Sequence, residues 1–255
     1  MKQRSELHNK LDRLGDAEAL VVEQVIDAEL TDIESNYLNS SWLVTDTWAA
    51  SFSARLRAHH ALNPEPIATS AFEAAFNEAC RNAGFEVVAT SSATHRFFDT
   101  TIITSGGLVR HVSLKSSSAR DIREDRLHIS KLTEAAWIQD TRRQRDRQQS
   151  IITLFQDYRA ATDAIVMLRM FPLPEAYRYQ LVEIDTSLFD HVDQLSVTQA
   201  QHGTINFPIG RNSRDRDYAI RIDKSDAKIT VTGVDIERCV IHGEWIIPNP
   251  SGVSR

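Results

Sequence analysis

Hydrophobic residues near the start of the chain recur with the spacing of amphipathic helices. Between residues 5 and 35, leucine, valine and isoleucine return every three or four positions, which predicts one or two helices with Gly15 as a candidate break. A further helix is predicted from Thr45 or Asp46 to His60, because a proline-containing segment, residues 63–66, follows it. The first part of the chain is therefore expected to be helical.

The next segment predicts a helix with clear start and stop signals, running from Ser70 to Gly84. Ser70 is a suitable N-cap, Glu73 stands three residues later as in a capping box, and Gly84 is a suitable C-terminal stop. A β-strand is expected to begin directly afterwards, at Phe85.

The central part of the chain predicts a β-hairpin. Two runs rich in β-branched residues, Asp99–Thr104 and Leu108–Lys115, are joined by Ser105–Gly107, whose two glycines suit the positive φ angles of a tight turn. Side chains alternate along a strand, so Ser113 and Lys115 point to the same side. The hairpin can bring a carboxylate, a hydroxyl and an ammonium group together at one end of a sheet. This is the skeleton of a metal-dependent nuclease site.

Beyond the hairpin, the pattern predicts a mixture of helices and strands. Helices are expected from about Leu127 to Tyr158, and two apolar runs, Ala164–Met170 and Tyr179–Ile184, indicate buried strands. The C-terminal part contains further β-rich stretches, namely Gly203–Ile209, Tyr218–Ile222, Lys228–Thr232 and Cys239–Ile247. The sequence thus predicts an α/β protein with a mixed sheet of about five strands, flanked by helices, and a β-rich C-terminal extension.

Composition places the chain among ordinary globular proteins. Its 255 residues, 42% hydrophobic and 25% charged, suit one compact domain with an N-terminal helical region (1–68), an α/β core (69–190) and a β-rich region (191–255). The N-terminus is too polar for a signal peptide, and no apolar run approaches the roughly 20 residues that span a bilayer. Cys80 and Cys239 are expected to be buried thiols, so we expect a cytoplasmic protein without membrane contact.

The charge is unevenly distributed. The chain carries a formal net charge of −6, and residues 1–50 alone account for it with four basic and ten acidic residues. Residues 110–147 hold ten lysines and arginines against six acidic residues, a local charge of +4. An acidic body with a basic cleft can still bind DNA, because phosphate contacts depend on the local field.

The hairpin motif resembles the PD-(D/E)xK nuclease superfamily, to which most type II restriction endonucleases belong. The resemblance rests on Asp99 at the start of one strand and Ser113-Leu114-Lys115 on the next, and it covers residues 71–140. Phe98 replaces the proline of the motif, and Ser113 replaces its acidic residue, which removes one metal ligand. A subset of restriction enzymes is similar in having Ser-x-Lys, and in these the carboxylate comes from the helix after the strand.

The resemblance implies a Mg²⁺ ion held by Asp99 and a second carboxylate, with Lys115 placing the attacking water and Ser113 hydrogen-bonding a water on the metal. Glu134, on the helix expected from Leu127 to Trp137, is the first candidate for that carboxylate. Glu124 is the second. Glu73, on the preceding helix, is another. Two of them have a plainer interpretation as well, since Glu134 can pair with Lys131 and Glu73 can complete its capping box.

Two arginine-rich segments are candidate DNA contacts. Arg142 and Arg143 belong to a run of four arginines that either faces phosphates or forms a solvated helix surface. The loop from Gly210 to Asp217 is either an exposed hairpin loop or a segment that reads base edges. The residues of this loop that we expect to contact DNA are Arg211, Asn212, Arg214 and Arg216.

The resemblance implies Mg²⁺-dependent, sequence-specific cleavage of double-stranded DNA, as in a type II restriction endonuclease. Cutting both strands of a symmetric site requires two active sites, so a homodimer is expected. No Walker loop or G-x-G-x-x-G motif appears, so no nucleotide cofactor is expected. Two alternatives stay open: a non-catalytic DNA-binding or interaction protein on the same fold, favoured by Ser113 at the acidic position, and a repair or RNA-directed nuclease.

Overall fold

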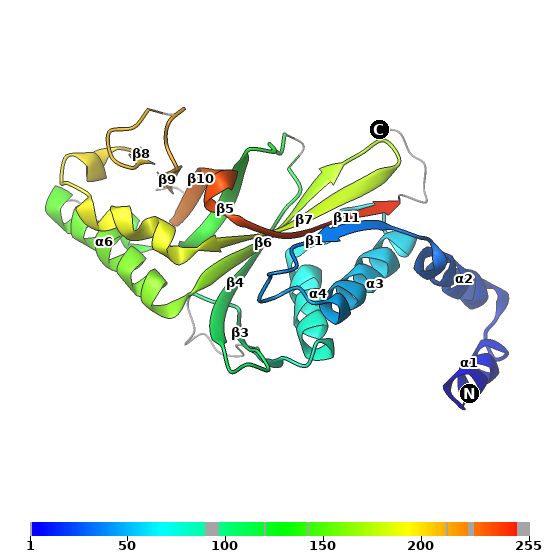
Figure 1. Cartoon of the computed structure of the whole chain (residues 1–255). Coiled ribbons are helices and arrows are strands. Elements are labelled where there is room, and N and C mark those ends of the chain that lie inside the picture. Colours follow the sequence, from blue (N-terminus) through cyan, green and yellow to red (C-terminus); the bar gives the residue numbers. More distant parts are fainter. Residues whose placement is uncertain are drawn as a thin grey trace.

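The strands of the protein form two β-sheets that share one body (Figure 1). The structure is a computed structural model that describes residues 2–89, 97–119, 121–141, 143–212, 214–223 and 227–248. It confirms an α/β protein in which a mixed sheet is flanked by helices. No helix in these ranges is long and apolar enough to cross a membrane.

The first sheet contains seven strands and carries the predicted hairpin. Its neighbouring strands are antiparallel except for one parallel pair, which joins the second strand of the hairpin to the buried strand that begins at Ala164. The sheet is larger than expected because a short N-terminal strand and the last strand add to one edge. In spatial order, its strands are β1 (Glu34–Tyr37), β11 (Val240–Pro248), β7 (Ala176–Asp185), β6 (Ala164–Pro172), β4 (Val109–Ser117), β3 (Thr100–Ile103) and β2 (Glu86–Ala89).

The second sheet is antiparallel, and it corrects one expectation from the sequence. Its strands, in spatial order, are β5 (Arg126–Glu134), β10 (Lys228–Asp235), β9 (Tyr218–Asp223) and β8 (Thr204–Phe207). The helix expected from Leu127 to Trp137 is wrong, because most of this segment is strand β5. A register irregularity between β5 and β10 brings Leu127, Ile129 and Leu132 all into the core. The step of three residues from Ile129 to Leu132 departs from strand alternation and resembles the spacing of a helix.

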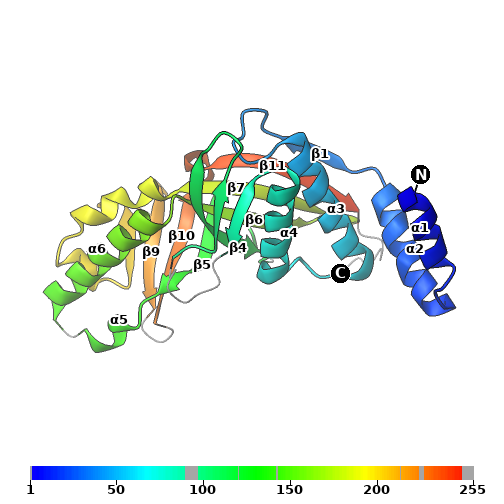
Figure 2. The ribbon, with the colours of Figure 1, turned by 90° about the horizontal axis from the view of Figure 1, so that it is seen from below.

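Two helices cover one face of the first sheet. Helices α3 (Asp46–Leu62) and α4 (Thr69–Asn82) lie side by side (Figure 2). They pack Trp48, Phe52 and Phe76 against strand residues that include Val112 and Leu114 of β4. Thr45 caps α3, its hydroxyl accepting a hydrogen bond from the main-chain N–H of Trp48 at 3.2 Å. Burying this many aromatic rings stabilises the sheet and fixes the face that β4 turns toward the helices.

The opposite face of the first sheet is covered by helix α6 (Gln144–Ala161), the 3₁₀ segment η1 (Thr186–Gln194) and the second sheet. Their shared core contains Tyr158 and Phe189 from these segments and Ile165 and Met167 from β6. In both views, α6 and the second sheet lie toward one end of the molecule, and α3 and α4 toward the other (Figures 1 and 2). The remaining short helical segments are α5 (Trp137–Asp140), η2 (Gln199–Gln201) and η3 (Ile236–Arg238).

The N-terminal helices project from this body (Figures 1 and 2). Helix α1 (Lys2–Leu11) and helix α2 (Asp16–Leu30) are separated at Gly15, which confirms the predicted break. No residue of α2 is buried, and Leu30 has a relative exposure of 77%. The contacts of α2 with the body are made mainly through α3.

Candidate active site

The hairpin opens at the end where the predicted residues lie. Strands β3 and β4 pair from Ile103 opposite Val109 to Thr100 opposite Val112, and Gly107 takes a positive φ of 79° in the turn. The last main-chain bond of the hairpin runs from the N–H of Asp99 to the carbonyl of Val112 at 2.9 Å. Strand β4 continues to Ser117 without β3 beside it. The open end therefore exposes one edge of β4 next to Asp99.

The structure brings Asp99, Ser113 and Lys115 together. The Asp99 carboxylate accepts hydrogen bonds from the main-chain N–H of Leu114 at 2.6 Å and from the Ser113 hydroxyl at 3.2 Å. The Lys115 ammonium nitrogen lies 3.6 Å from the same carboxylate oxygen. Ser113 is buried, whereas the side chains of Asp99 and Lys115 keep 36% and 23% exposure. The carboxylate is thus held in a fixed position while both charged groups remain reachable from solvent.

Glu73 lies beside this cluster, on helix α4. The first turn of α4 is attached to β4 by a hydrogen bond of 2.7 Å between the hydroxyls of Thr69 and Ser116. Glu73 follows Thr69 by four residues, about one helical turn. Burial raises the pKa of Glu73, the Asp99 charge raises it further, and the Lys115 charge opposes both. The two carboxylates therefore act on each other, as expected for groups that share one cation.

The capping-box interpretation of Glu73 is wrong. Helix α4 begins at Thr69 rather than Ser70, and its N-cap is Ala68, which makes no side-chain capping bond. The hydroxyl of Thr69 is used in the contact with β4 instead. Glu73 is therefore not held at the helix start by a capping partner.

The other two acidic candidates lie in different surroundings. Glu134 ends strand β5 in the second sheet, where its exposed carboxylate forms an ion pair with Lys131 at 2.8 Å. Its proposed role as a metal ligand assumed a helix that does not exist, although the role itself stays a prediction. Glu124 lies in the loop between β4 and β5 and forms an ion pair with Arg178 of β7.

The donor set of the cluster suits a hard divalent cation. The described part of the chain contains no group of three histidine, cysteine or acidic residues that could enclose a metal ion. Asp99 and Glu73 together supply two carboxylates, and a cation between them would relieve the repulsion that contributes to the raised pKa of Glu73. Mg²⁺ fits this arrangement, because proteins hold it with one or two carboxylates and leave its remaining positions to water and phosphate.

Two residues near this cluster were not among the site residues predicted from the sequence. Tyr158, near the C-terminal end of α6, is fully buried, and burial raises its pKa, with the Asp99 charge adding to the effect and the Ser113 hydroxyl opposing it. The sequence could not predict this position, because a tyrosine on the apolar face of a helix is usually an ordinary core residue. His111, on β4 two residues before Ser113, has its Nδ1 3.3 Å from the carboxylate of Asp163.

The described residues of the predicted arginine run lie in and directly before the first turn of α6. Arg142 lies outside the described residues, and Arg143 is the exposed residue directly before α6. Tyr158 follows Arg143 by fifteen positions, a distance of about 22 Å along the helix axis. Arg147 is only 8% exposed and belongs to the buried side of α6. The assignment of Arg142 and Arg143 to DNA binding stays a prediction.

The other predicted DNA-contacting residues lie on the loop between β8 and β9. Arg211 and Asn212 are exposed, but the Asn212 side-chain oxygen accepts hydrogen bonds from the main-chain N–H groups of Arg214 and Asp215, at 2.8 and 3.1 Å. Asn212 therefore shapes the loop, as asparagine commonly does in turns. Arg214 and Arg216 line a pocket beside the end of β4.

A second chain of polar side chains resembles a catalytic triad but has a structural role. Buried His242 lies between the Ser41 hydroxyl at 2.8 Å and the Glu183 carboxylate at 2.7 Å. The Ser41 oxygen also accepts the main-chain N–H groups of Leu43 and Val44. This hydroxyl therefore organises the turn before α3.

Comparison with known proteins identifies the family. The family model described as SmaI, type II site-specific deoxyribonuclease, matches residues 13–247. The type II restriction enzyme SmaI of Serratia marcescens is 25% identical over 233 residues, which cover 86% of this chain and 88% of that enzyme. No solved structure matches the chain. Because the family match spans nearly the whole sequence, the chain belongs to the SmaI family of type II site-specific deoxyribonucleases.

Proposed function

We propose that the protein is a type II restriction endonuclease that cleaves double-stranded DNA at a specific sequence, with Mg²⁺ bound at Asp99 and Glu73. Its membership of a deoxyribonuclease family supports the substrate and the reaction class. The observation that carries the site assignment is the convergence of Asp99, Glu73 and Lys115 at the open end of the β3–β4 hairpin.

The fold assignment that goes with this function is a variant PD-(D/E)xK core. Asp99 precedes one strand, Lys115 lies on the next, and a mixed sheet carries both, which is consistent with that core. Ser113 takes the position of the second acidic residue. Among the three glutamates considered as its substitute, Glu73 has the best structural support. Its helix is hydrogen-bonded to β4 through Thr69 and Ser116, and the charges of Asp99 and Lys115 both contribute to its pKa.

Each residue has a defined task in the proposed hydrolysis. Mg²⁺, when bound, neutralises charge on the phosphate and helps a water molecule to lose its proton. Lys115 orients the attacking water and stabilises the negative charge that develops on the phosphate. Ser113 and the main-chain N–H of Leu114 fix the Asp99 carboxylate through their hydrogen bonds. This arrangement places charged groups before the reaction begins, so little reorganisation is needed.

We also propose that the active form is a homodimer. A symmetric DNA site presents two equivalent phosphodiester bonds, and one chain contributes one cluster of this kind. Light scattering coupled to size-exclusion chromatography tests the proposal directly. A mass of twice 28.8 kDa supports it, and a monomer that remains monomeric on its cleavage site contradicts it.

Digestion of phage or plasmid DNA tests the proposed function. Purified protein is incubated with DNA in the presence of Mg²⁺ and, in parallel, of EDTA. Discrete fragments that form only with Mg²⁺ support a sequence-specific endonuclease. A smear would indicate a non-specific nuclease, and intact DNA across several substrates would favour the non-catalytic alternative suggested by Ser113 at the acidic position.

A further inference from the structure

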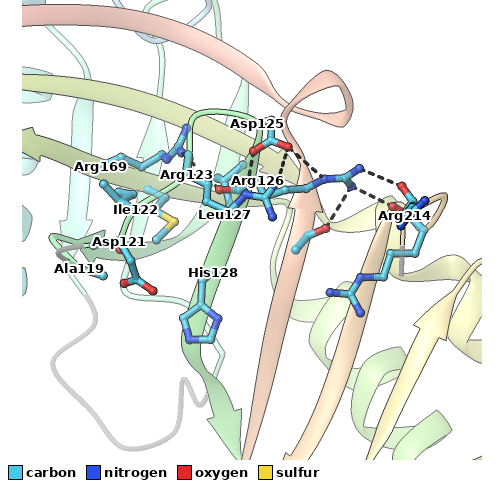
Figure 3. Close-up of a pocket in the computed structure, with 14 residues that line it drawn as sticks. Ala119, Asp121, Ile122, Arg123, Asp125, Arg126, Leu127, His128, Arg169 and Arg214 are labelled. Atoms are coloured by element: carbon cyan, nitrogen blue, oxygen red, sulfur yellow. Dashed lines mark hydrogen bonds and ion pairs between the residues drawn. The ribbon is translucent and has the colours of Figure 1, made fainter. Parts of the chain in front are cut away.

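A basic pocket adjoins the proposed active site. The pocket has a volume of about 790 Å³ and lies between the end of β4, the middle of β6, the start of β5, and the loop before β9 (Figure 3). Ser117 of β4 lines it. Because side chains alternate along a strand, Ser117 shares the face of Lys115, two residues earlier. The pocket therefore continues from the face that carries Ser113 and Lys115.

The charge of this pocket is opposite to that of the protein. Five arginines and two aspartates line it, a net charge of +3 with histidine neutral, whereas the whole chain carries −6. Field lines concentrate in clefts lined by one sign of charge, so a polyanion would be attracted to this place on an acidic protein. The five arginines are Arg123, Arg126, Arg169, Arg214 and Arg216.

Arg169 builds one wall of the pocket. It is 1% exposed and lies on β6, opposite Ser117 in the parallel pair with β4. Its guanidinium group donates hydrogen bonds to the main-chain carbonyls of Arg123 and Arg126 and to the side chain of Gln180. Arg169 thus attaches the segment before β5 to strand β6, which pairs with β4.

Arg126 builds the opposite wall. Its guanidinium group donates to the carbonyls of Arg216 at 2.9 Å and of Gly233 and Arg214 at 3.4 Å, and it pairs with Asp235 at 3.0 Å. Figure 3 shows this side chain extended from β5 toward the chain at Arg214. The loop before β9 is therefore held in place without any ligand.

Arg123 is paired with Asp125 at 2.7 Å, so two of the five arginines, Arg214 and Arg216, remain for a ligand. Arg216 donates to Asn206 at 2.8 Å, and burial together with the Arg126 charge lowers its pKa. Gly233 makes room for it, because a Cβ there would lie 2.9 Å from its guanidinium. Arg214 is exposed, and within the described part of the chain its guanidinium has no hydrogen bond or ion pair. An anion in the pocket would balance both charges.

We propose that this pocket binds the sugar-phosphate backbone of duplex DNA beside the bond that is cut, with Arg214 and Arg216 contacting phosphates. The inference rests on the proposed function. Base edges lie on the floor of a groove and are read by protruding side chains, whereas a concave basic surface fits the protruding backbone. Arg126 and Arg169 act as positioning residues. Arg214 and Arg216 then supply affinity rather than the base readout expected from the sequence.

Fluorescence anisotropy with a labelled duplex of random sequence, measured in EDTA over a series of salt concentrations, tests this proposal. Arg214→Gln is expected to weaken binding and to lower the slope of log affinity against log salt by about 1. The ratio of wild-type affinity to variant affinity should therefore fall about fourfold between roughly 50 and 200 mM salt. Arg13→Gln, the same change at an exposed arginine near the N-terminus, serves as the matched control.

The outcomes separate this proposal from the proposed function, because binding is measured without metal and without cleavage. If the wild type cuts DNA and Arg214→Gln keeps both its affinity and its salt slope, the pocket proposal alone is wrong. If the salt slope falls but the wild type cuts nothing, the proposed function alone is wrong. Once the cleavage site is mapped, the affinity of each protein for that site can be compared with its affinity for random DNA. If Arg214→Gln changes this ratio, Arg214 reads bases and the proposed backbone contact is wrong.

Discussion

The carboxylate of Asp99 and the ammonium group of Lys115 lie 3.6 Å apart where β4 extends beyond its pairing with β3. Both groups keep part of their surface exposed, so a phosphate can reach them. Hydrogen bonds from the Ser113 hydroxyl and the Leu114 main-chain N–H hold the Asp99 carboxylate in place beside Lys115. The pair therefore defines where the reaction is expected to occur.

Lys115→Ala should slow DNA cleavage by at least about 100-fold, because a group that stabilises developing negative charge is lost. The fold should persist, since Lys115 lies at the surface end of β4 and its side chain is 23% exposed. Single-turnover cleavage rates and circular dichroism spectra measure the two effects. Lys131→Ala, at an exposed lysine of the second sheet, is the matched control and should keep full activity. Undiminished cutting by the Lys115 variant would rule out the site.

The raised pKa of Glu73 predicts a pH-dependent stability difference in metal-free protein. Burial and the Asp99 charge disfavour the ionised form in the folded state, so the wild type loses stability as pH rises from the usual value of 4.5 through the raised pKa. Glu73→Gln removes this loss. The variant should therefore melt at a higher temperature than the wild type near pH 7 in EDTA, with a gap that closes as pH falls below 4.5.

Mg²⁺ should reverse that order. The ion stabilises the wild type by binding its folded state, and the variant should gain much less. Thermal unfolding with and without Mg²⁺ measures this, with Glu175→Gln as an exposed control. An equal gain in the wild type and the Glu73 variant would separate Glu73 from the metal.

His242→Ala should destabilise the protein by about 3 kcal/mol, because it leaves the buried Glu183 carboxylate without its histidine partner. The rate of DNA cleavage per folded molecule should not change, since this network organises the turn before α3. Denaturant unfolding and cleavage assays give the two values. A large loss of activity in fully folded variant would show that the Ser41–His242–Glu183 chain has a chemical role.

The hairpin and its charged residues could be predicted because their signals are local. Two glycines between β-branched runs define the turn, and strand alternation places Ser113 and Lys115 on one side. The helix expected at β5 failed for a tertiary reason, since an irregular pairing with β10 changes which side chains point inward. The apolar spacing alone could not reveal that partner.

The choice among the glutamates also depended on the tertiary structure. Glu73 has the sequence spacing of a capping box. Only the structure shows that α4 begins earlier, at Thr69, and that the Thr69 hydroxyl bonds to Ser116, so Glu73 belongs to no capping box. The basic pocket was hidden for a similar reason. Arg126, Arg169 and Arg214 are distant in the sequence and meet only when the two sheets pack together.

Single-turnover cleavage by Glu73→Gln and Glu134→Gln in saturating Mg²⁺ tests the central claim most directly. If Asp99, Glu73 and Lys115 form the active site, the first variant should lose at least about 100-fold in rate, since it removes one of the two carboxylates proposed to hold the Mg²⁺ ion that stabilises charge on the phosphate. The second, which changes an exposed residue paired with Lys131 in the other sheet, should cut like the wild type. An inactive Glu134 variant beside a fully active Glu73 variant would contradict the account.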